Sequence, residues 1–299
     1  MLRTHTIRYF CAITLITLPQ HTFTKNLPIV LVHGIFSDKH AMIPVEKHIQ
    51  QHIPNVYVKN IQLGLGKLTS FFNMYDQTRW LKEELESDEN LQDGCIMIAH
   101  SQGGLVARHF IEQYNNPRVY VYISWGSPQA GIFGSPGGWD NEPGWLRYIE
   151  DFSYSVIYSY LMQRLVSFAG YWKDPLHYDE YLQKSTFLPY LNNEIEHANS
   201  ELFKRNMCSL ESMVIVQSTQ EDVVDPAVSS HFGFYHIGSS EKICSLFDSE
   251  WYQEDKLGLK TLADSGRLHL EFAECSHTNF QADEYNFIAN TLPYLIHPV

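Results

Sequence analysis

The sequence predicts an α/β fold in which a mostly parallel sheet is flanked by helices. Three observations support this prediction: apolar runs of strand length recur along the chain, segments with helical spacing alternate with them, and one apolar run stops abruptly at Ser101. Such alternation is typical of a parallel sheet covered on both faces. With 299 residues and 44% hydrophobic content, the chain can bury one large core, so we expect a single domain over residues 25–299.

The expected elements are set by apolar runs and by the turn-forming residues between them. The first run, at residues 27–32, ends at His33 and Gly34, which is typical of a buried strand followed by a loop. Further strands are expected at residues 56–63, 95–99, 119–125, 212–218 and 267–273. Helices are expected at residues 41–52, 74–87, 102–114 and 285–296.

Ser101 lies in the most informative stretch, residues 94–104, with the sequence Gly-Cys-Ile-Met-Ile-Ala-His-Ser-Gln-Gly-Gly. A strand that ends at Ala99 would pass into a helix that begins near Gln102, and the tight turn between them would expose the Ser101 hydroxyl as a nucleophile elbow does. Small residues at Ala99 and Gly103 suit this turn because the strand and helix backbones approach closely. An incidental serine on an ordinary turn is the alternative, since so short a pattern also arises by accident.

The order of polar residues along the chain favours the catalytic interpretation. The strand at 212–218 is followed by carboxylates at 221–225, and the last strand is followed by His277. Serine, acid and histidine follow one another in this order in α/β-hydrolases, where the histidine takes the serine proton and the acid orients the histidine. We therefore expect an α/β-hydrolase fold with Ser101 as nucleophile and His277 as base.

Two backbone amides would complete such a site. In this fold class the oxyanion is held by the amide of the residue after the nucleophile, here Gln102, and by one from the loop after an early strand, here Ile35. Two other histidines stand beside these motifs. We interpret His33 as support for the loop, and His100 as a structural residue that points to the opposite side of the strand or turn.

The regular alternation fails between residues 131 and about 207. A Gly/Pro-rich loop at 134–138 opens a helical stretch rich in aromatic residues, and we expect a helical insertion at about 134–207 that lies over the active site. Its aromatic side chains either pack as ordinary core or together line a groove for a long acyl chain. They are Trp145, Tyr154, Tyr158, Tyr160, Phe168, Tyr171 and Trp172.

Composition excludes several classes of partner. The formal net charge of −13 argues against nucleic acid and against charge-driven binding to anionic membranes. No spacing of His or Cys is typical of a metal site, so we expect no metal and no cofactor.

The N-terminus predicts a targeting segment. Arg3 and Arg8 precede an apolar run at 9–18 that is too short to span a bilayer, so residues 1–24 are expected to be a signal peptide. An uncleaved anchor or a buried N-terminal segment is the alternative. No other run approaches a membrane span. Removal of Cys11 leaves an even number of cysteines, which suits disulfides in an oxidising compartment: Cys95, Cys208, Cys244 and Cys275.

Several strings along the chain are shared with one known family. The chain resembles the palmitoyl-protein thioesterases from about Leu27 to the C-terminus, nearer their second, more lipid-directed branch. The resemblance implies an α/β-hydrolase fold, a lumenal and usually lysosomal location, and hydrolysis of fatty acyl thioesters. It also places Ser101 and His277 on the nucleophile and the base. The shared strings are residues 32–36, 101–106, 171–175, 232–235, 257–260 and 276–278.

The resemblance leaves the acid open. An ungapped alignment puts the family's catalytic aspartate on Glu221, whereas a shift of one residue presents Asp222. Asp225, beside Pro226, is the structural alternative and would cap the following turn. The family's N-glycans have no counterpart, because no Asn-x-Ser/Thr sequence occurs.

The sequence thus predicts a secreted or lysosomal serine hydrolase. We expect it to cleave long-chain acyl thioesters, of the palmitoyl-protein or palmitoyl-CoA type, through an acyl-enzyme on Ser101. An oxygen-ester lipase on the same scaffold is one alternative, because the triad does not itself distinguish the two bonds. An inactive lipid-binding or interaction protein is the other.

Overall fold

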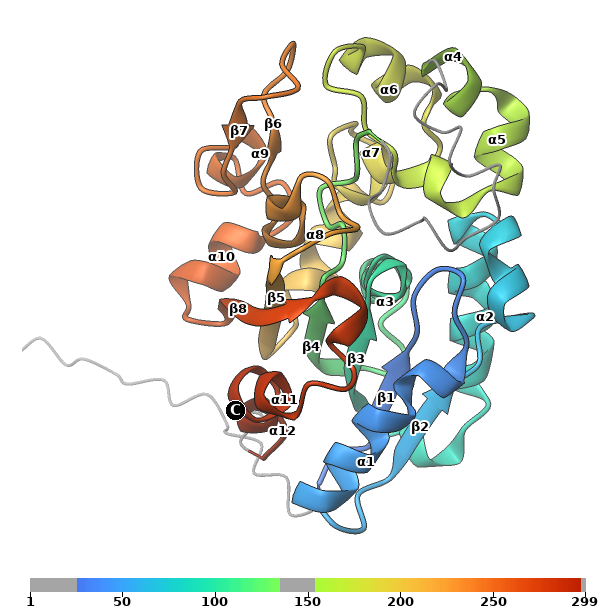
Figure 1. Cartoon of the computed structure of the whole chain (residues 1–299), viewed down its shortest axis with the longest axis vertical. Coiled ribbons are helices and arrows are strands. Elements are labelled where there is room, and N and C mark those ends of the chain that lie inside the picture. Colours follow the sequence, from blue (N-terminus) through green and yellow to red (C-terminus); the bar gives the residue numbers. More distant parts are fainter. Residues whose placement is uncertain (1–25, 135–153, 297–299) are drawn as a thin grey trace, which may run out of the picture.

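The computed structural model describes residues 26–134 and 154–296, and its centre is a sheet of six strands (Figure 1). Every neighbouring pair of strands runs parallel, so the carboxyl ends of all six lie at one edge. In spatial order the strands are β2 (Val58–Ile61), β1 (Ile29–Val32), β3 (Cys95–His100), β4 (Val119–Trp125), β5 (Ser212–Gln220) and β8 (Leu268–Ser276).

Helices cover both faces of this sheet, because alternate strand residues feed two separate cores. Residues such as Leu31 and Ile98 join the core under one set of helices, whereas Val32 and Met97 join the core under the other. The first set is α1 (Ile43–His52), α11 (Glu284–Asn290) and α12 (Leu292–Ile296). The second set is α2 (Met74–Glu86), α3 (Gln102–Gln113), α8 (Ser200–Cys208) and α10 (Leu259–Asp264).

The expected α/β-hydrolase fold is confirmed, and the expected strands all occur within a few residues of their predicted ends. Two differences from the expected ends are local. β3 continues through His100, one residue beyond the expected end. The expected helix at 285–296 is two helices, α11 and α12, because Pro293 lacks the N–H needed to continue a helix and favours the first turn of a new one.

The connection between β4 and β5 holds short helices that lie beyond the carboxyl edge of the sheet (Figure 1). Its aromatic residues Tyr158, Phe168, Tyr171 and Trp172 are buried and join the same core as α2 and α3. They therefore pack as ordinary core, while Trp145 and the rest of 135–153 lie outside the described residues. The helices are α4 (Tyr154–Ile157), α5 (Tyr160–Leu165), α6 (Tyr178–Lys184) and α7 (Leu188–Leu191).

Smaller elements complete the described chain. A two-stranded antiparallel hairpin, β6 (Phe234–Tyr235) with β7 (Ile243–Cys244), and α9 (Glu250–Gln253) follow β5. The 3₁₀ helices are η1 (Lys39–Met42), η2 (Gly66–Phe71), η3 (Glu89–Leu91), η6 (Ser167–Tyr171), η7 (Ala227–His231) and η8 (His277–Asn279).

The four cysteines after residue 24 are all free thiols, so the even number of cysteines does not correspond to disulfides here. The two buried ones, Cys95 and Cys275, lie on β3 and β8, which are separated by β4 and β5. Since neighbouring strands are about 4.8 Å apart, the two sulfur atoms are far beyond bonding distance.

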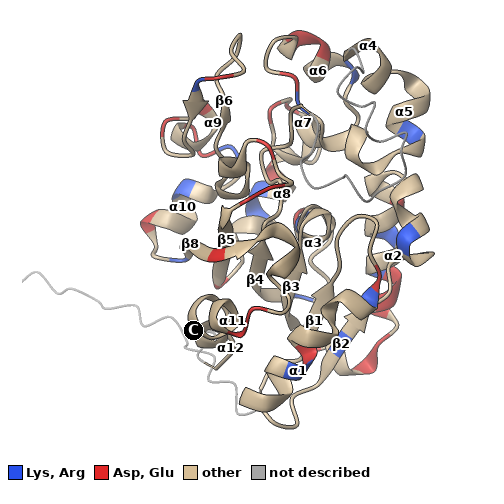
Figure 2. Ribbon diagram, in the orientation of Figure 1, with Lys and Arg blue, Asp and Glu red and all other residues tan. Residues whose placement is uncertain are grey.

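Surface and membrane features are limited. Lys and Arg are spread over several helices and loops rather than gathered on one element (Figure 2). Across residues 26–134 and 154–296, no helix has the length and apolarity to cross a bilayer. The same ranges hold no group of three or more His, Cys, Asp or Glu side chains that could bind a metal ion. The expected signal peptide at 1–24 lies outside the described residues.

Candidate active site

Ser101 occupies a strained turn between β3 and α3. Its φ of 55° and ψ of −132° lie in a region that non-glycine residues rarely adopt. The helix that follows approaches β1 so closely that a Cβ on Gly103 would lie 2.3 Å from the His33 carbonyl oxygen. A glycine at 103 is therefore required, as the sequence predicts, and Ser101 is held at the carboxyl edge of the sheet.

His277 reaches this serine from the end of β8. Its Nε2 lies 3.0 Å from Ser101 Oγ, and its Nδ1 lies 2.8 Å from Glu221 Oε1. The nearby carboxylate favours a proton on Nδ1, and a proton there leaves Nε2 free to accept the serine O–H. The side chains of His277 and Glu221 are only 5% and 1% exposed, so this contact is shielded from water.

The adjacent acids, Glu221 and Asp222, both contact His277, in different ways. Glu221 Oε1 also accepts the backbone N–H groups of Val223 and Val224, each at 3.0 Å. Burial alone would raise the pKa of Glu221, but the contact with His277 and these two N–H groups lower it. Asp222 Oδ1 instead accepts the backbone N–H of His277 at 3.2 Å. The structure thus brings Glu221 to the ring and Asp222 to the main chain.

Asp225 is not near the histidine ring. Its Oδ1 accepts the hydroxyl of Tyr235 at 2.8 Å, which ties the loop after β5 to the β6–β7 hairpin. No side chain caps the 3₁₀ helix after Pro226, so the expectation that Asp225 caps this turn is wrong.

Ile35 and Gln102, whose backbone amides are expected to hold an oxyanion, border Ser101. Gln102 is the first residue of α3, where the backbone N–H has no partner within the helix and lies at the positive end of the helix dipole. The loop that carries Ile35 passes so near that a Cβ on Gly34 would lie 2.9 Å from Ser101 Cβ. Their role as oxyanion donors stays a prediction, as do the catalytic roles of the side chains.

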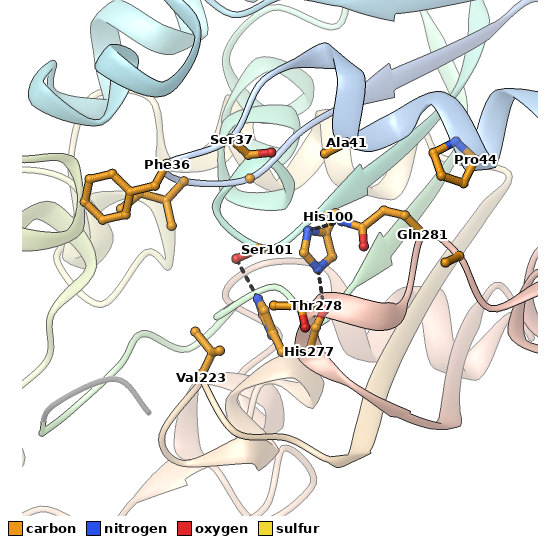
Figure 3. Close-up of a pocket in the computed structure, with 13 residues that line it drawn as sticks. Phe36, Ser37, Ala41, Pro44, His100, Ser101, Val223, His277, Thr278 and Gln281 are labelled. Carbon is orange, nitrogen blue, oxygen red and sulfur yellow. Dashed lines mark hydrogen bonds between the residues drawn. The ribbon is translucent and has the colours of Figure 1, made fainter. Parts of the chain in front are cut away.

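A pocket of about 390 Å³ opens beside Ser101 and His277 (Figure 3). Its walls come from the loop after β1, the start of α1, and the loops after β5 and β8. None of the described aromatic residues of 154–207 lines this pocket. An acyl groove lined by those side chains stays a prediction. The apolar lining is Ile35, Phe36, Ala41, Pro44, Val223 and Ala282.

The two other histidines have separate positions. His33 Nε2 accepts the Leu63 N–H at 3.2 Å and its Nδ1 lies 2.9 Å from the Gly34 carbonyl, which confirms its support of the loop. His100 was expected to point away, but its ring lines the pocket, 4.8 Å from the His277 ring. Because β3 extends to residue 100, this side chain faces the side on which the loop after β8 passes.

Gln281 is a pocket residue that sequence reasoning did not find. Its amide Nε2 lies 2.7 Å from His100 Nδ1, although the two residues are 181 positions apart. It sits after η8 with no motif of its own, so only the fold reveals the contact.

Comparison with known proteins gives a consistent result. Residues 28–277 match the family model described as "Palmitoyl protein thioesterase". "Palmitoyl-protein thioesterase 3" of Dictyostelium discoideum is 37% identical, covering 95% of this chain and 97% of that protein. "Palmitoyl-protein thioesterase 1" of Caenorhabditis elegans is 32% identical, covering 91% and 94%.

A third relative belongs by name to the second branch. It is the "Lysosomal thioesterase PPT2 homolog" of Drosophila melanogaster, 32% identical over 81% of this chain and 82% of that protein. Its identity does not exceed that of the other two relatives, so the expected closeness to the second branch is not distinguished. Among solved structures, an esterase from Rhodococcus sp. ECU1013 superposes with a TM-score of 0.49 at 15% identity, covering 91% of each chain.

Proposed function

We propose that this chain, which belongs to the palmitoyl protein thioesterase family, hydrolyses long-chain fatty acyl thioesters through an acyl-enzyme on Ser101. One observation carries the proposal most directly. Ser101 Oγ lies 3.0 Å from His277 Nε2, in the wall of a largely apolar pocket. A serine in this relation to a neutral imidazole is the arrangement that acyl transfer requires.

In the first half of the proposed reaction, Ser101 Oγ attacks the thioester carbonyl carbon while its proton passes to His277 Nε2. The carbonyl oxygen becomes an oxyanion, which the N–H groups of Ile35 and Gln102 stabilise. When the carbon–sulfur bond breaks, the Nε2 proton passes to the departing thiolate. Glu221 stabilises the imidazolium that exists between these two transfers, since its carboxylate lies 2.8 Å from Nδ1.

In the second half, water replaces the thiol. His277 Nε2 takes a proton from a water molecule while the water oxygen attacks the acyl carbon. When the ester bond breaks, His277 passes this proton to Ser101 Oγ. The products are a free fatty acid and the regenerated enzyme.

The assay that tests this function compares thioester with oxygen ester. Purified protein is given palmitoyl-CoA, a palmitoylated cysteine peptide and the matched serine ester, with Ser101→Ala as the control. We expect the thioesters to give the higher kcat/KM and the control to give none. Faster turnover of the oxygen ester would assign the chain to the lipase alternative. Absence of turnover, together with no covalent labelling of Ser101 by a fluorophosphonate, would assign it to the inactive alternative.

The pocket beside Ser101 is the proposed acyl site. Each methylene buried against its apolar lining contributes about 0.8 kcal/mol, or roughly fourfold in kcat/KM, until the pocket is full. We therefore expect kcat/KM to rise with chain length and then level off. Ala41 lines the pocket, so Ala41→Trp narrows it and moves the plateau to shorter chains. A flat profile in both proteins would contradict this acyl site.

A secreted or lysosomal location belongs to the same proposal. The basic and apolar N-terminal segment and the relative named as a lysosomal thioesterase support it. Expression of a C-terminally tagged chain, with N-terminal sequencing of the product, tests it. Cleavage near residue 24 is expected, and an intact N-terminus in a cytosolic fraction would contradict it.

A further inference from the structure

His100, the residue directly before Ser101, contacts two parts of the loop after β8 (Figure 3). Its Nε2 lies 2.9 Å from the backbone carbonyl oxygen of His277, and its Nδ1 lies 2.7 Å from the amide nitrogen of Gln281. One ring at the end of β3 therefore spans η8, which begins with His277. The backbone position of His277 is thereby linked, through His100, to the position of Ser101.

The hydrogen bonds fix the protonation of this ring. A carbonyl oxygen only accepts, so His100 Nε2 carries a proton and donates it to His277. The Gln281 amide nitrogen only donates, so His100 Nδ1 accepts and carries no proton. Both contacts are satisfied together by a single species, the neutral Nε2–H tautomer.

The surroundings also oppose a charge on His100. The side chain is buried, and burial together with His277 and His33 lowers its pKa to about 3. The neutrality of His100 matters because the centroids of the His100 and His277 rings are 4.8 Å apart. In the proposed reaction, His277 becomes an imidazolium each time it takes up a proton. A second positive charge at this distance would oppose that imidazolium.

We propose that His100 is a positioning residue for His277: its neutral ring, held by the Gln281 amide, fixes the His277 backbone so that Nε2 stays in line with Ser101 Oγ. This inference rests on the proposed role of His277 as the base. His100 touches neither the serine proton nor the substrate carbonyl in this scheme. His100 acts by holding the main chain of His277. Because its own ring is uncharged, it also does not repel the His277 imidazolium.

Kinetics of two substitutions test the positioning. His100→Phe keeps an aromatic ring but removes the donor, and we expect kcat to fall about 10- to 100-fold because a small misplacement of a catalytic group is costly. KM should change by less than about threefold. His100→Gln places an amide N–H the same number of bonds from Cα as Nε2, so it should recover most of the lost kcat. His269→Phe is the matched control on β8, outside the pocket, and should behave as wild type.

The rate at which a fluorophosphonate labels Ser101 compares wild type, His100→Phe and His100→Gln without a thioester substrate. It therefore separates failure of this inference from failure of the proposed substrate. Equal loss in His100→Phe and His100→Gln with unchanged melting temperature would overturn the proposal, as would full activity in His100→Phe.

Imidazole ¹⁵N NMR tests the charge directly, with the His100 signals assigned from their loss in His100→Gln. We expect the neutral Nε2–H tautomer throughout the range between about pH 5 and pH 8. Gln281→Glu replaces the amide donor with a carboxylate, so His100 should take up its second proton at a higher pH than in the wild type. Gln281→Met, its uncharged counterpart, should leave the ring neutral. Titration of His100 within that range in the wild type, or an Nδ1–H tautomer, would contradict the proposal.

Discussion

Asp222 Oδ1 accepts the backbone N–H of His277 at 3.2 Å, and so holds the main chain of the histidine rather than its ring. Glu221, the preceding residue, lies 2.8 Å from the ring nitrogen Nδ1. The two neighbouring carboxylates thus divide the positioning of one histidine between them. Loss of either should disturb His277, but only loss of the Glu221 charge should remove the stabilisation of its imidazolium.

The first prediction separates these acids. Glu221→Gln should lower kcat on a thioester by about 10⁴-fold, because an amide can hold His277 in the wrong tautomer. Asp222→Asn should cost less than about tenfold, because the asparagine oxygen still accepts the same N–H. Asp225→Asn, at the residue bound to Tyr235, is the control and should be near normal. A larger loss in Asp222→Asn than in Glu221→Gln would reverse the assignment.

The sequence could predict the sheet, the elbow and the chain order of the site, because those depend on local patterns. Gly103 is an example: the requirement for a small residue follows from the turn alone. It could not choose between Glu221 and Asp222, since a loop after a strand can present either of two consecutive side chains. Nor could it find the contact between His100 and Gln281, because no periodicity links residues brought together only by the packing of separate loops.

The second prediction concerns the backbone strain at Ser101, whose φ is 55°. Glycine adopts such a conformation without the strain of about 1–3 kcal/mol borne by other residues. Ser101→Gly should therefore be at least as stable as Ser101→Ala, whereas glycine in an ordinary helix or strand is about 0.5–1 kcal/mol less stable than alanine. Denaturant unfolding of both inactive variants measures this. A clearly less stable glycine variant would show that the turn is not strained.

The third prediction concerns the pH dependence of stability. The pKa of Glu221 is lowered from 4.5 in the folded protein, so the folded state binds this proton less readily than the unfolded state. Its contribution to stability is fully present above about pH 4.5 and is lost as the pH falls through the lower folded-state value.

Urea unfolding between about pH 3 and pH 7 should therefore show Glu221→Gln to be less stable than wild type at neutral pH, with the difference shrinking in acid. Glu241→Gln, at an exposed glutamate, is the matched control and should show no such trend. A difference that grows in acid would contradict the direction of the shift.

The fourth prediction concerns the buried side chains of Arg108 and Glu112 within α3. Arg108 Nη1 lies 3.6 Å from Glu112 Oε1, and both side chains are 0% exposed. Burial raises the pKa of Glu112 to about 8 even though the charge of Arg108 lowers it, so this site disfavours a carboxylate. Arg108 also donates to the Asn192 side chain at 2.7 Å and to the Gln129 carbonyl at 3.1 Å. The arginine thus links α3 to the connection between β4 and β5.

Arg108→Met should lower the free energy of unfolding by about 3–5 kcal/mol, because it leaves Glu112 buried without its partner and removes the donor to Asn192 and Gln129. Arg108→Met combined with Glu112→Leu should recover much of this loss, since a buried pair replaced by apolar residues of similar volume is often neutral. Denaturant unfolding of the single and double variants measures the difference as a double-mutant cycle. If the losses of the single variants Arg108→Met and Glu112→Leu instead add up to that of the double variant, the two side chains are not coupled. The cost of Arg108→Met then lies in the lost contacts to Asn192 and Gln129.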